Sequence, residues 1–131
     1  MIHLRLDPRS AMPVYAQLTR QVRAAVLRGV LVPGDRLPAA REVVSSLAIN
    51  PNTVLKSYSI LEHEGVVCSR AGQGTFVAET APTPISASIR QNLEPALWIW
   101  MARARDAGLD EEAVFALFES TVDSTYRAGA A

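Results

Sequence analysis

Small amide and hydroxyl side chains are concentrated in residues 50–56, together with a lysine. Asn50, Asn52 and Thr53 lie within four positions, and Lys56 follows about one helical turn later. An asparagine amide can pair with adenine through two hydrogen bonds, threonine can reach a base or a phosphate, and lysine can bind a phosphate or a guanine. These residue types therefore predict contacts with DNA. The alternative is that Asn50 and Thr53 only cap a helix and that Lys56 is a solvated surface charge.

Two arginines precede this polar segment. Arg41 is expected early in a short helix after Pro38, and Arg36 lies just before that helix. Both are expected where the first helices would meet a DNA backbone, since a guanidinium can grip a phosphate or read a guanine. The alternative for Arg41 is a helix-surface side chain beside Glu42 that contributes little.

A glycine-bearing loop follows the polar segment. Arg70 ends one β-prone stretch, and Gly72, Gln73 and Gly74 lead into the next. Glycines let a backbone approach a phosphate closely or enter the minor groove, and Arg70 would add positive charge. These four residues are therefore predicted to contact DNA. The alternative is that the glycines merely turn the chain, as in any hairpin.

The apolar pattern predicts the helices that would hold these side chains. Apolar residues recur every fourth position from Val14 to Val26 and predict a first helix. A second helix is predicted to open at Pro38. A third is predicted at Asn50, because an asparagine cap followed by Pro51 at the first helical position is a strong helix start. Two helices joined by so short a turn are typical of a helix-turn-helix, whose second helix docks in the major groove of DNA.

Two β-prone stretches, 66–70 and 75–78, flank the glycine loop and predict a hairpin. A hairpin after a helix-turn-helix forms a wing, so residues 1–78 are predicted to be a winged helix-turn-helix DNA-binding domain. Residues 79–84 are polar, contain prolines and predict a linker. Residues 85–131 predict a helical dimerisation tail. The predicted fold class is therefore mainly α with a small β-hairpin, followed by a C-terminal two-helix dimerisation region.

The predicted tail has two helices with apolar stripes. Pro95 lies within the first helix and would either kink it or begin a new helix, and Asp110 is expected to cap the second. The stripes exceed what two isolated helices can cover, so they are predicted to pack on a second copy of the chain. The predicted homodimer interface comprises Leu97, Trp100, Met101, Val114, Leu117 and Phe118. The alternative is that these side chains cover the first helix of their own chain.

Charge is unevenly distributed along the 131 residues, although 13 basic and 13 acidic residues balance. Residues 1–78 hold nine Lys or Arg against five Asp or Glu, a net charge of +4. Residues 79–131 hold four Arg against eight Asp or Glu, a net charge of −4. This asymmetry favours a front half that binds a polyanion.

Cys68 is the one cysteine, so no internal disulfide can form, which is typical of a reducing cytoplasm. His3, His63 and Cys68 lack metal-ligand spacing, and neither a metal nor a cofactor is predicted. No apolar run is long enough to span a bilayer, and the first residues do not read as a secretory signal. We therefore expect a cytoplasmic protein with no membrane partner.

From Pro13 to Val77 the chain resembles the GntR family of bacterial transcription regulators. The matching motifs occur in the family's order and spacing over about half of the chain. They are PVYAQL from Pro13, PGDRLP from Pro33, Arg41-Glu42, Asn52-Thr53-Val54, LEHEG from Leu61 and GQGTFV from Gly72. The resemblance implies DNA contacts from Arg41, from the helix start at 50–53, from a basic residue such as Lys56, and from the wing glycine Gly72.

Two positions depart from the family pattern. Ala48-Ile49 stands where the family usually has Gly-Val, so Ala48 would be strained if the turn requires a positive φ. Pro51 stands where the family often has a basic residue, which implies that one phosphate contact is missing. The short helical tail resembles the YtrA-like subfamily, in which such a tail mediates dimerisation.

We therefore predict a homodimeric, sequence-specific transcription regulator, a repressor that binds a palindromic operator in double-stranded DNA. The resemblance alone implies that a small-molecule effector changes the spacing of the two DNA-binding heads. The first alternative is a winged-helix protein–protein interaction module without specific DNA binding. The second is an enzyme, namely the DNA-binding head of an aminotransferase-like regulator separated from its catalytic part. Lys56 is the one lysine in the chain, which leaves no Schiff-base lysine, and no enzymatic activity is predicted.

Overall fold

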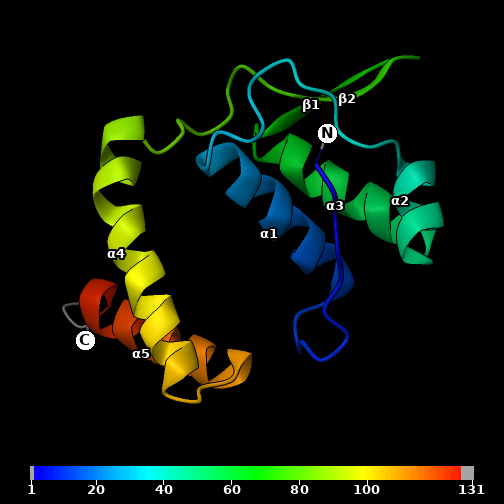
Figure 1. Ribbon diagram of the computed structural model, residues 1–131. Coiled ribbons are helices and arrows are strands. Elements are labelled where there is room, and N and C mark those ends of the chain that lie inside the picture. The colour runs from blue at the N-terminus through cyan, green and yellow to red at the C-terminus, as the bar shows by residue number, and fades with distance from the viewer. Residues whose placement is uncertain (1, 128–131) are drawn as a thin grey trace. The chain divides into compact units, whose positions relative to one another are not determined.

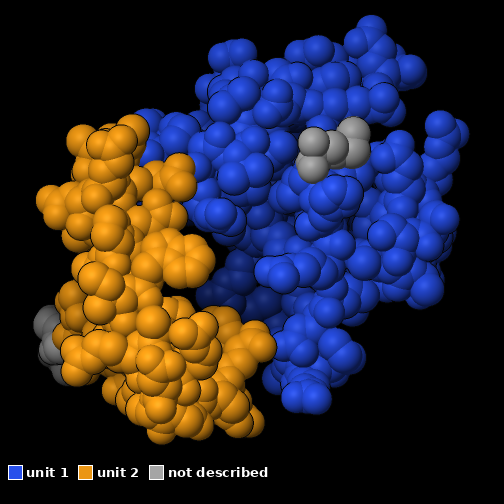
Figure 2. All heavy atoms as spheres, viewed as in Figure 1, with its two compact units in different colours: residues 1–85 blue, residues 86–131 orange. Residues whose placement is uncertain are grey.

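The computed structural model describes residues 2–127, so residue 1 and residues 128–131, at the ends of the two predicted regions, lie outside the described residues. The chain divides into two compact units, Met1–Ile85 and Ser86–Ala131, which Figure 2 shows in different colours. The predicted linker at 79–84 lies within the first unit, just before this division.

Three helices enclose the core of the first unit: α1 (Val14–Leu27), α2 (Ala40–Leu47) and α3 (Pro51–His63) (Figure 1). The apolar stripe of α1 packs against one face of α3, and α2 packs across the same helix. The buried residues of the two longer helices include Leu18, Val22 and Val26 on α1 and Val54, Tyr58 and Leu61 on α3. The predicted helical periodicity is therefore confirmed, and burial of one side of α3 leaves its other side to solvent.

The turn between α2 and α3 has the geometry that the sequence indicates. Ala48 has φ 54° and ψ 48°, a left-handed conformation that is strained for a residue with a Cβ. Asn50 then caps α3, because its side-chain oxygen accepts a hydrogen bond from the backbone N–H of Asn52 at 2.8 Å. Pro51 occupies the first helical position, where a missing N–H costs nothing.

The wing is an antiparallel hairpin of β1 (Val67–Arg70) and β2 (Gly74–Val77), paired in register from Val67–Val77 to Arg70–Gly74. The predicted winged helix-turn-helix, mainly α with a small β-hairpin, is confirmed by these elements. The structure adds an extended segment that borders β2: the Leu37 N–H donates to the Thr75 carbonyl at 2.8 Å.

The prediction that Pro38 opens the second helix is wrong, since α2 begins at Ala40. The backbone just before α2 is hydrogen-bonded to the wing, because the Val77 N–H donates to the Asp35 carbonyl at 2.8 Å. Ala39 remains extended, with ψ 148°, before the first helical turn. Pairing with a strand almost forty residues later in the sequence therefore delays the helix.

The second unit consists of α4 (Ala87–Asp106) and α5 (Glu111–Tyr126). Side chains cap both helices: Ser86 Oγ accepts from the Ile89 N–H at 3.3 Å, and Asp110 Oδ1 accepts from the Ala113 N–H at 2.9 Å. Pro95 lies inside α4, which runs through it as one helix, so the alternative that it begins a new helix is wrong.

Candidate nucleic-acid interface

The first turn of α3 presents polar groups at the surface. Pro51, Asn52, Lys56 and Ser59 are exposed on one side of the helix, while Val54 on the opposite side is fully buried. Asn50, just before the helix, is also exposed, and Thr53 is half-buried. The structure thus brings the predicted residues of 50–56 together at one end and on one side of α3. This is the geometry that a helix needs to enter a DNA groove.

Asn50 has a structural role in addition to any contact with DNA. Its side-chain oxygen is the cap of α3, which confirms the capping interpretation. The oxygen is occupied in this way, and the NH2 group of the same amide remains to donate to a base or a phosphate. The predicted capping role and the predicted DNA contact are therefore compatible.

Lys56 is held against an aromatic ring. Its Nζ lies 3.9 Å from the ring centroid of Tyr15 at the start of α1. An ammonium at this distance from an aromatic face is attracted by the ring quadrupole. The three N–H donors that surround Nζ are not used up by this attraction, so Lys56 keeps the capacity to bind a phosphate. The sequence analysis missed Tyr15, since its contact joins positions 41 residues apart.

Arg41 lies in the first turn of α2 and is exposed, as are Glu42, Ser45 and Ser46 on the same helix. None of the hydrogen bonds or ion pairs between described side chains fixes the Arg41 guanidinium to Glu42. The guanidinium is therefore on the surface, where it can reach a DNA backbone, and its predicted contact stays a prediction.

Arg36 belongs to the wing, which corrects the expectation that it lies where the first helices meet the DNA. Its backbone forms an isolated antiparallel bridge with Phe76, and its side chain passes over Gly74. A Cβ at Gly74 would lie 3.1 Å from Arg36 Nε. Gly74 also has φ 124°, so its backbone favours glycine, and a Cβ there would have to displace the Arg36 side chain slightly.

Arg70 lies on the same face of the wing as Arg36. Its guanidinium carbon is 4.2 Å from the ring centroid of Phe76, and Arg70 is paired with Gly74 across the hairpin. One guanidinium therefore lies over the Phe76 ring and the other lies beside Gly74 on the same face of the wing. Such a face suits an anionic backbone.

The tip of the wing is a tight turn closed by a hydrogen bond from the Gln73 N–H to the Arg70 carbonyl at 2.9 Å. Gly72 and Gln73 are exposed, and Gly72 has φ 72°. The interpretation that the glycines turn the chain is thus confirmed. Their contact with DNA stays a prediction.

Two glutamates of the LEHEG motif fix the recognition helix to its surroundings. Glu62 Oε2 accepts a hydrogen bond from the backbone N–H of Ser69 on β1 at 2.6 Å. Glu64 forms a two-bond ion pair with Arg23 of α1, at 3.0 Å and 3.2 Å. The sequence analysis gave these carboxylates no role. They join the wing and α1 to the end of α3, beside the apolar core that these elements share.

Tyr58 anchors α3 from the buried side. Its hydroxyl donates to the Pro38 carbonyl at 2.6 Å, just before α2. Burial, and secondarily the nearby charge of Glu42, raises the pKa of Tyr58 above its ordinary value. Tyr58 therefore stays a neutral donor, and its hydrogen bond joins the two helices of the helix-turn-helix.

The residues predicted as a dimer interface divide into three pairs. The rings of Trp100 and Phe118 have centroids 5.0 Å apart and an angle of 55°, so these two residues join α4 to α5 within one chain. Leu97 and Leu117 are 45% and 48% exposed. Met101 and Val114 are half-buried. Further exposed apolar residues, which the sequence analysis did not include, are Ile89, Leu93, Trp98, Ile99 and Phe115.

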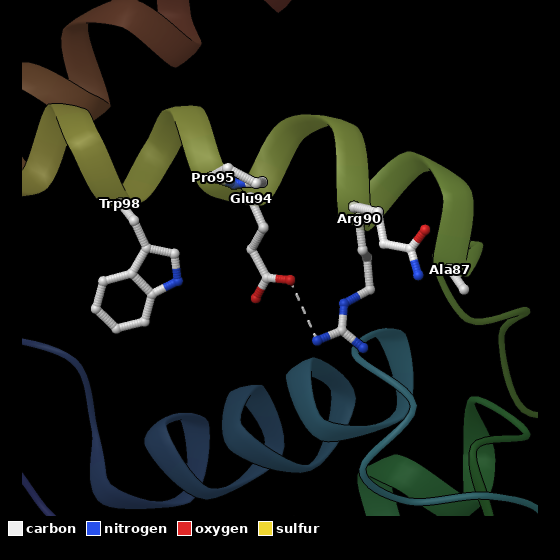
Figure 3. Close-up of a pocket in the computed structure, with 6 residues that line it drawn as sticks. Ala87, Arg90, Glu94, Pro95 and Trp98 are labelled. Atoms are coloured by element: carbon white, nitrogen blue, oxygen red, sulfur yellow. Dashed lines mark ion pairs between the residues drawn. The ribbon is translucent and has the colours of Figure 1, made fainter.

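One side of α4 also carries charge. Arg90, Glu94 and Trp98 point the same way from the helix and help to line a surface pocket (Figure 3). Arg90 Nη2 lies 3.3 Å from Glu94 Oε2, an ion pair between residues one helical turn apart. Trp98 is 71% exposed, so this side of α4 leaves a large aromatic ring in water.

Among residues 2–127, no group of three or more His, Cys, Asp or Glu side chains is placed to hold a metal ion. Within the same range, no helix is both long enough and apolar enough to cross a membrane.

The fold and the polar surface around α3 together define a winged helix-turn-helix protein. Residues 14–77 match the model of the bacterial regulatory proteins of the gntR family. The chain is also 30% identical to YtrA from Sulfolobus acidocaldarius, a GntR-family transcription factor, with a TM-score of 0.53 over 76% of this chain and 97% of that one. The chain therefore belongs to the GntR family of bacterial regulatory proteins, as the motifs predict.

Two further similarities bear on function. The HTH-type transcriptional repressor YtrA of Bacillus subtilis (strain 168) is 42% identical over 82 residues, which are 63% of this chain and 63% of the relative. The chain thus spans less than two thirds of that relative's length. The structure of AraR(DBD) in complex with operator ORX1 matches with a TM-score of 0.51 and 28% identity, over 57% of this chain and 93% of that one.

Proposed function

We propose that the protein is a sequence-specific DNA-binding transcription regulator, without enzymatic activity, that acts in the cytoplasm as a repressor. The observation that carries the proposal is the first turn of α3, which is polar and exposed at the end of a helix whose opposite side is buried. The operator complex of AraR(DBD) and the repressor name of the Bacillus relative support it by similarity.

In this proposal α3 lies in the major groove and the wing lies against the neighbouring backbone. Asn50, Asn52 and Thr53 face base edges, and Lys56 neutralises a phosphate or binds guanine. Arg41 binds the backbone on the α2 side. Further contacts come from the wing, through Arg36, Arg70, Gly72, Gln73 and Gly74. Pro51 contributes shape to the first turn of the helix, not a phosphate contact.

Fluorescence anisotropy with a duplex selected from a random pool tests this proposal. We expect Arg41→Ala and Thr53→Ala each to weaken binding, by about 1–3 kcal/mol where a base contact is lost. Binding should also weaken steeply with salt, because several phosphates are neutralised. Arg103→Ala, which removes an exposed arginine of α4, is the matched control and should bind as the wild type does. Wild-type affinity in both interface variants would contradict the proposal.

The alternative is a protein–protein interaction module, which the zero net charge of the chain would suit. It predicts that no duplex is enriched from the pool, or that the affinity for duplexes hardly changes with salt. The same anisotropy titration therefore separates the two functions.

We further propose that the second unit makes the protein a homodimer. Leu93 and Leu97 are 63% and 45% exposed, and their spacing places them on one stripe of α4. On α5, Phe115 is 62% exposed and Leu117 is 48% exposed. So many exposed apolar side chains on two helices favour burial against a second copy of the chain. Two identical heads would then read the two halves of a palindromic operator.

Sedimentation velocity tests the dimer. Because Leu93 is exposed, Leu93→Asp should spare the fold of the chain and yield monomers. Trp100→Asp is a poorer test, because it also removes the ring contact with Phe118. Gln91→Asp, at an exposed position two residues from Leu93 and therefore on another side of α4, controls for the added charge. An unchanged mass of Leu93→Asp would contradict this interface.

We also propose that a small-molecule effector alters the spacing of the two DNA-binding heads.

A further inference from the structure

Leu55 is an isolated apolar side chain on the exposed side of α3. It is 55% exposed, and its neighbours on that side are Pro51, Asn52, Lys56 and Ser59. Other exposed large apolar residues of the first unit lie elsewhere, at the end of α1, in the turn that follows it and at the end of the unit: Leu27, Val30, Val32 and Ile85. Leu55 is thus the one large apolar group that α3 would carry into a groove.

The helix geometry places this side chain near the tip of the recognition helix. Side chains of an α-helix tilt toward its N-terminus, so a residue covers the turn that precedes it. Leu55 therefore leans over Pro51 and Asn52, which occupy the first turn of α3. The Asn52 amide, which can pair with adenine, lies at the same end of α3.

We propose that Leu55 reads the 5-methyl group of a thymine, an inference that rests on the proposed DNA-binding function. The major groove offers one apolar feature to a protein, the thymine methyl, and its other base edges are hydrogen-bond donors and acceptors. A leucine cannot form hydrogen bonds with those edges, but it can bury a methyl group. Leu55 is therefore a specificity-determining residue that distinguishes thymine from cytosine at one position of each half-site.

Replacing thymine with deoxyuridine tests this contact, because the change removes the methyl group and keeps the base pair. A duplex is first selected from a random pool with the wild-type protein. Each thymidine of one half-site is then replaced singly, and binding is measured by fluorescence anisotropy. We expect the wild type to lose affinity about fourfold at one position, the effect of leaving one methyl-sized group unburied.

Variants at position 55 identify the residue that makes the contact. Leu55→Ala should bind the thymine duplex more weakly than the wild type and should not respond to deoxyuridine at that position. Leu55→Met, which keeps an apolar side chain of similar length, should retain the response. Leu27→Ala, which shortens an exposed leucine of α1, is the control and should behave as the wild type does.

The outcomes separate this inference from the proposed function. If a duplex is enriched but no deoxyuridine substitution weakens binding, or if Leu55→Ala keeps the full response, the thymine contact is wrong and DNA binding stands. If no duplex is enriched from the pool, the proposed function fails, and this inference fails with it.

Discussion

The contact between Lys56 and Tyr15 gives a quantitative prediction about operator binding. The Lys56 ammonium lies 3.9 Å from the centroid of the Tyr15 ring, well inside the distance of about 6 Å at which such pairs attract. The two residues come from α3 and α1, and Lys56 is exposed. Replacing Tyr15 with leucine removes the ring and leaves an apolar side chain to pack at the same place.

The expected loss of operator affinity in Tyr15→Leu follows from the flexibility of the lysine side chain. Ordering a lysine side chain costs about 1.5–2 kcal/mol of rotamer freedom. The exposed cation–π contact already orders the lysine in the free protein, and it offsets about 0.5–1 kcal/mol of that cost before DNA is bound. The ammonium can still bind a phosphate with the donors that point away from the ring. Tyr15→Leu should therefore weaken operator binding about two- to fivefold.

Anisotropy titrations at several salt concentrations check this prediction. Tyr15→Phe keeps the aromatic ring and therefore the cation–π contact, so it should bind DNA within about a factor of two of the wild type. Lys56→Ala should reduce the slope of log K against log salt by about 0.9, because one phosphate contact is lost. Tyr15→Leu should leave this slope unchanged, since Lys56 still reaches the phosphate.

The double variant decides whether the ring acts through the lysine. In the Lys56→Ala background, Tyr15→Leu should have no further effect. An equal loss in both backgrounds would show that Tyr15 acts on DNA or on the fold by another route. Tighter binding by Tyr15→Leu would show that the ring holds Lys56 away from DNA, and either result would refute the reasoning.

Three further predictions concern the elements that hold the interface. Ala48→Gly should raise the free energy of unfolding in urea by about 0.5–1 kcal/mol, because relief of left-handed strain outweighs the added freedom of the unfolded chain. Glu62→Ala should weaken operator binding by freeing the Ser69 N–H from its acceptor, while Glu62→Gln, which keeps an acceptor, should restore it. Tyr58→Phe should cost about 1–3 kcal/mol of stability by leaving the Pro38 carbonyl unpaired. Folding raises the pKa of Tyr58, and tyrosines of the unfolded chain ionise above about pH 10. The wild type should therefore also lose stability as the pH rises above about 10. Urea titrations of Tyr58→Phe should lack this part of the loss.

The parts of the fold that depend on neighbouring residues could be predicted from the sequence. The start of α3 is an example, because an asparagine cap and Pro51 act within one turn and need no distant partner. The hairpin could be predicted for the same reason. The strain at Ala48 could be expected only through the resemblance, because the family usually has glycine there, and the structure shows the left-handed conformation that this implies.

Long-range contacts account for what the sequence analysis missed. Arg36 lies on the wing because its segment pairs with β2. No local pattern around Arg36 indicates that its backbone partner is forty residues away. The ring contact of Trp100 with Phe118 has the same origin. An apolar stripe predicts that a face is buried, but it does not tell whether the covering surface belongs to the same chain or to another copy.

The contacts around α3 separate the residues that hold the recognition helix from those that would read DNA. Tyr58, Glu62 and Glu64 each bond a different neighbour: the start of α2, the wing and α1. Tyr58 and Glu62 lie in the middle and last turns of α3, and Glu64 is its C-cap, so none of the three lies in the first turn. Exposed side chains at the start of the helix, such as Asn52, can therefore change without removing these anchors, whereas Val54 is buried in the core. If α3 reads DNA as proposed, a substitution of the exposed Asn52 or Leu55 should therefore change which duplex is bound more than how stably the protein folds.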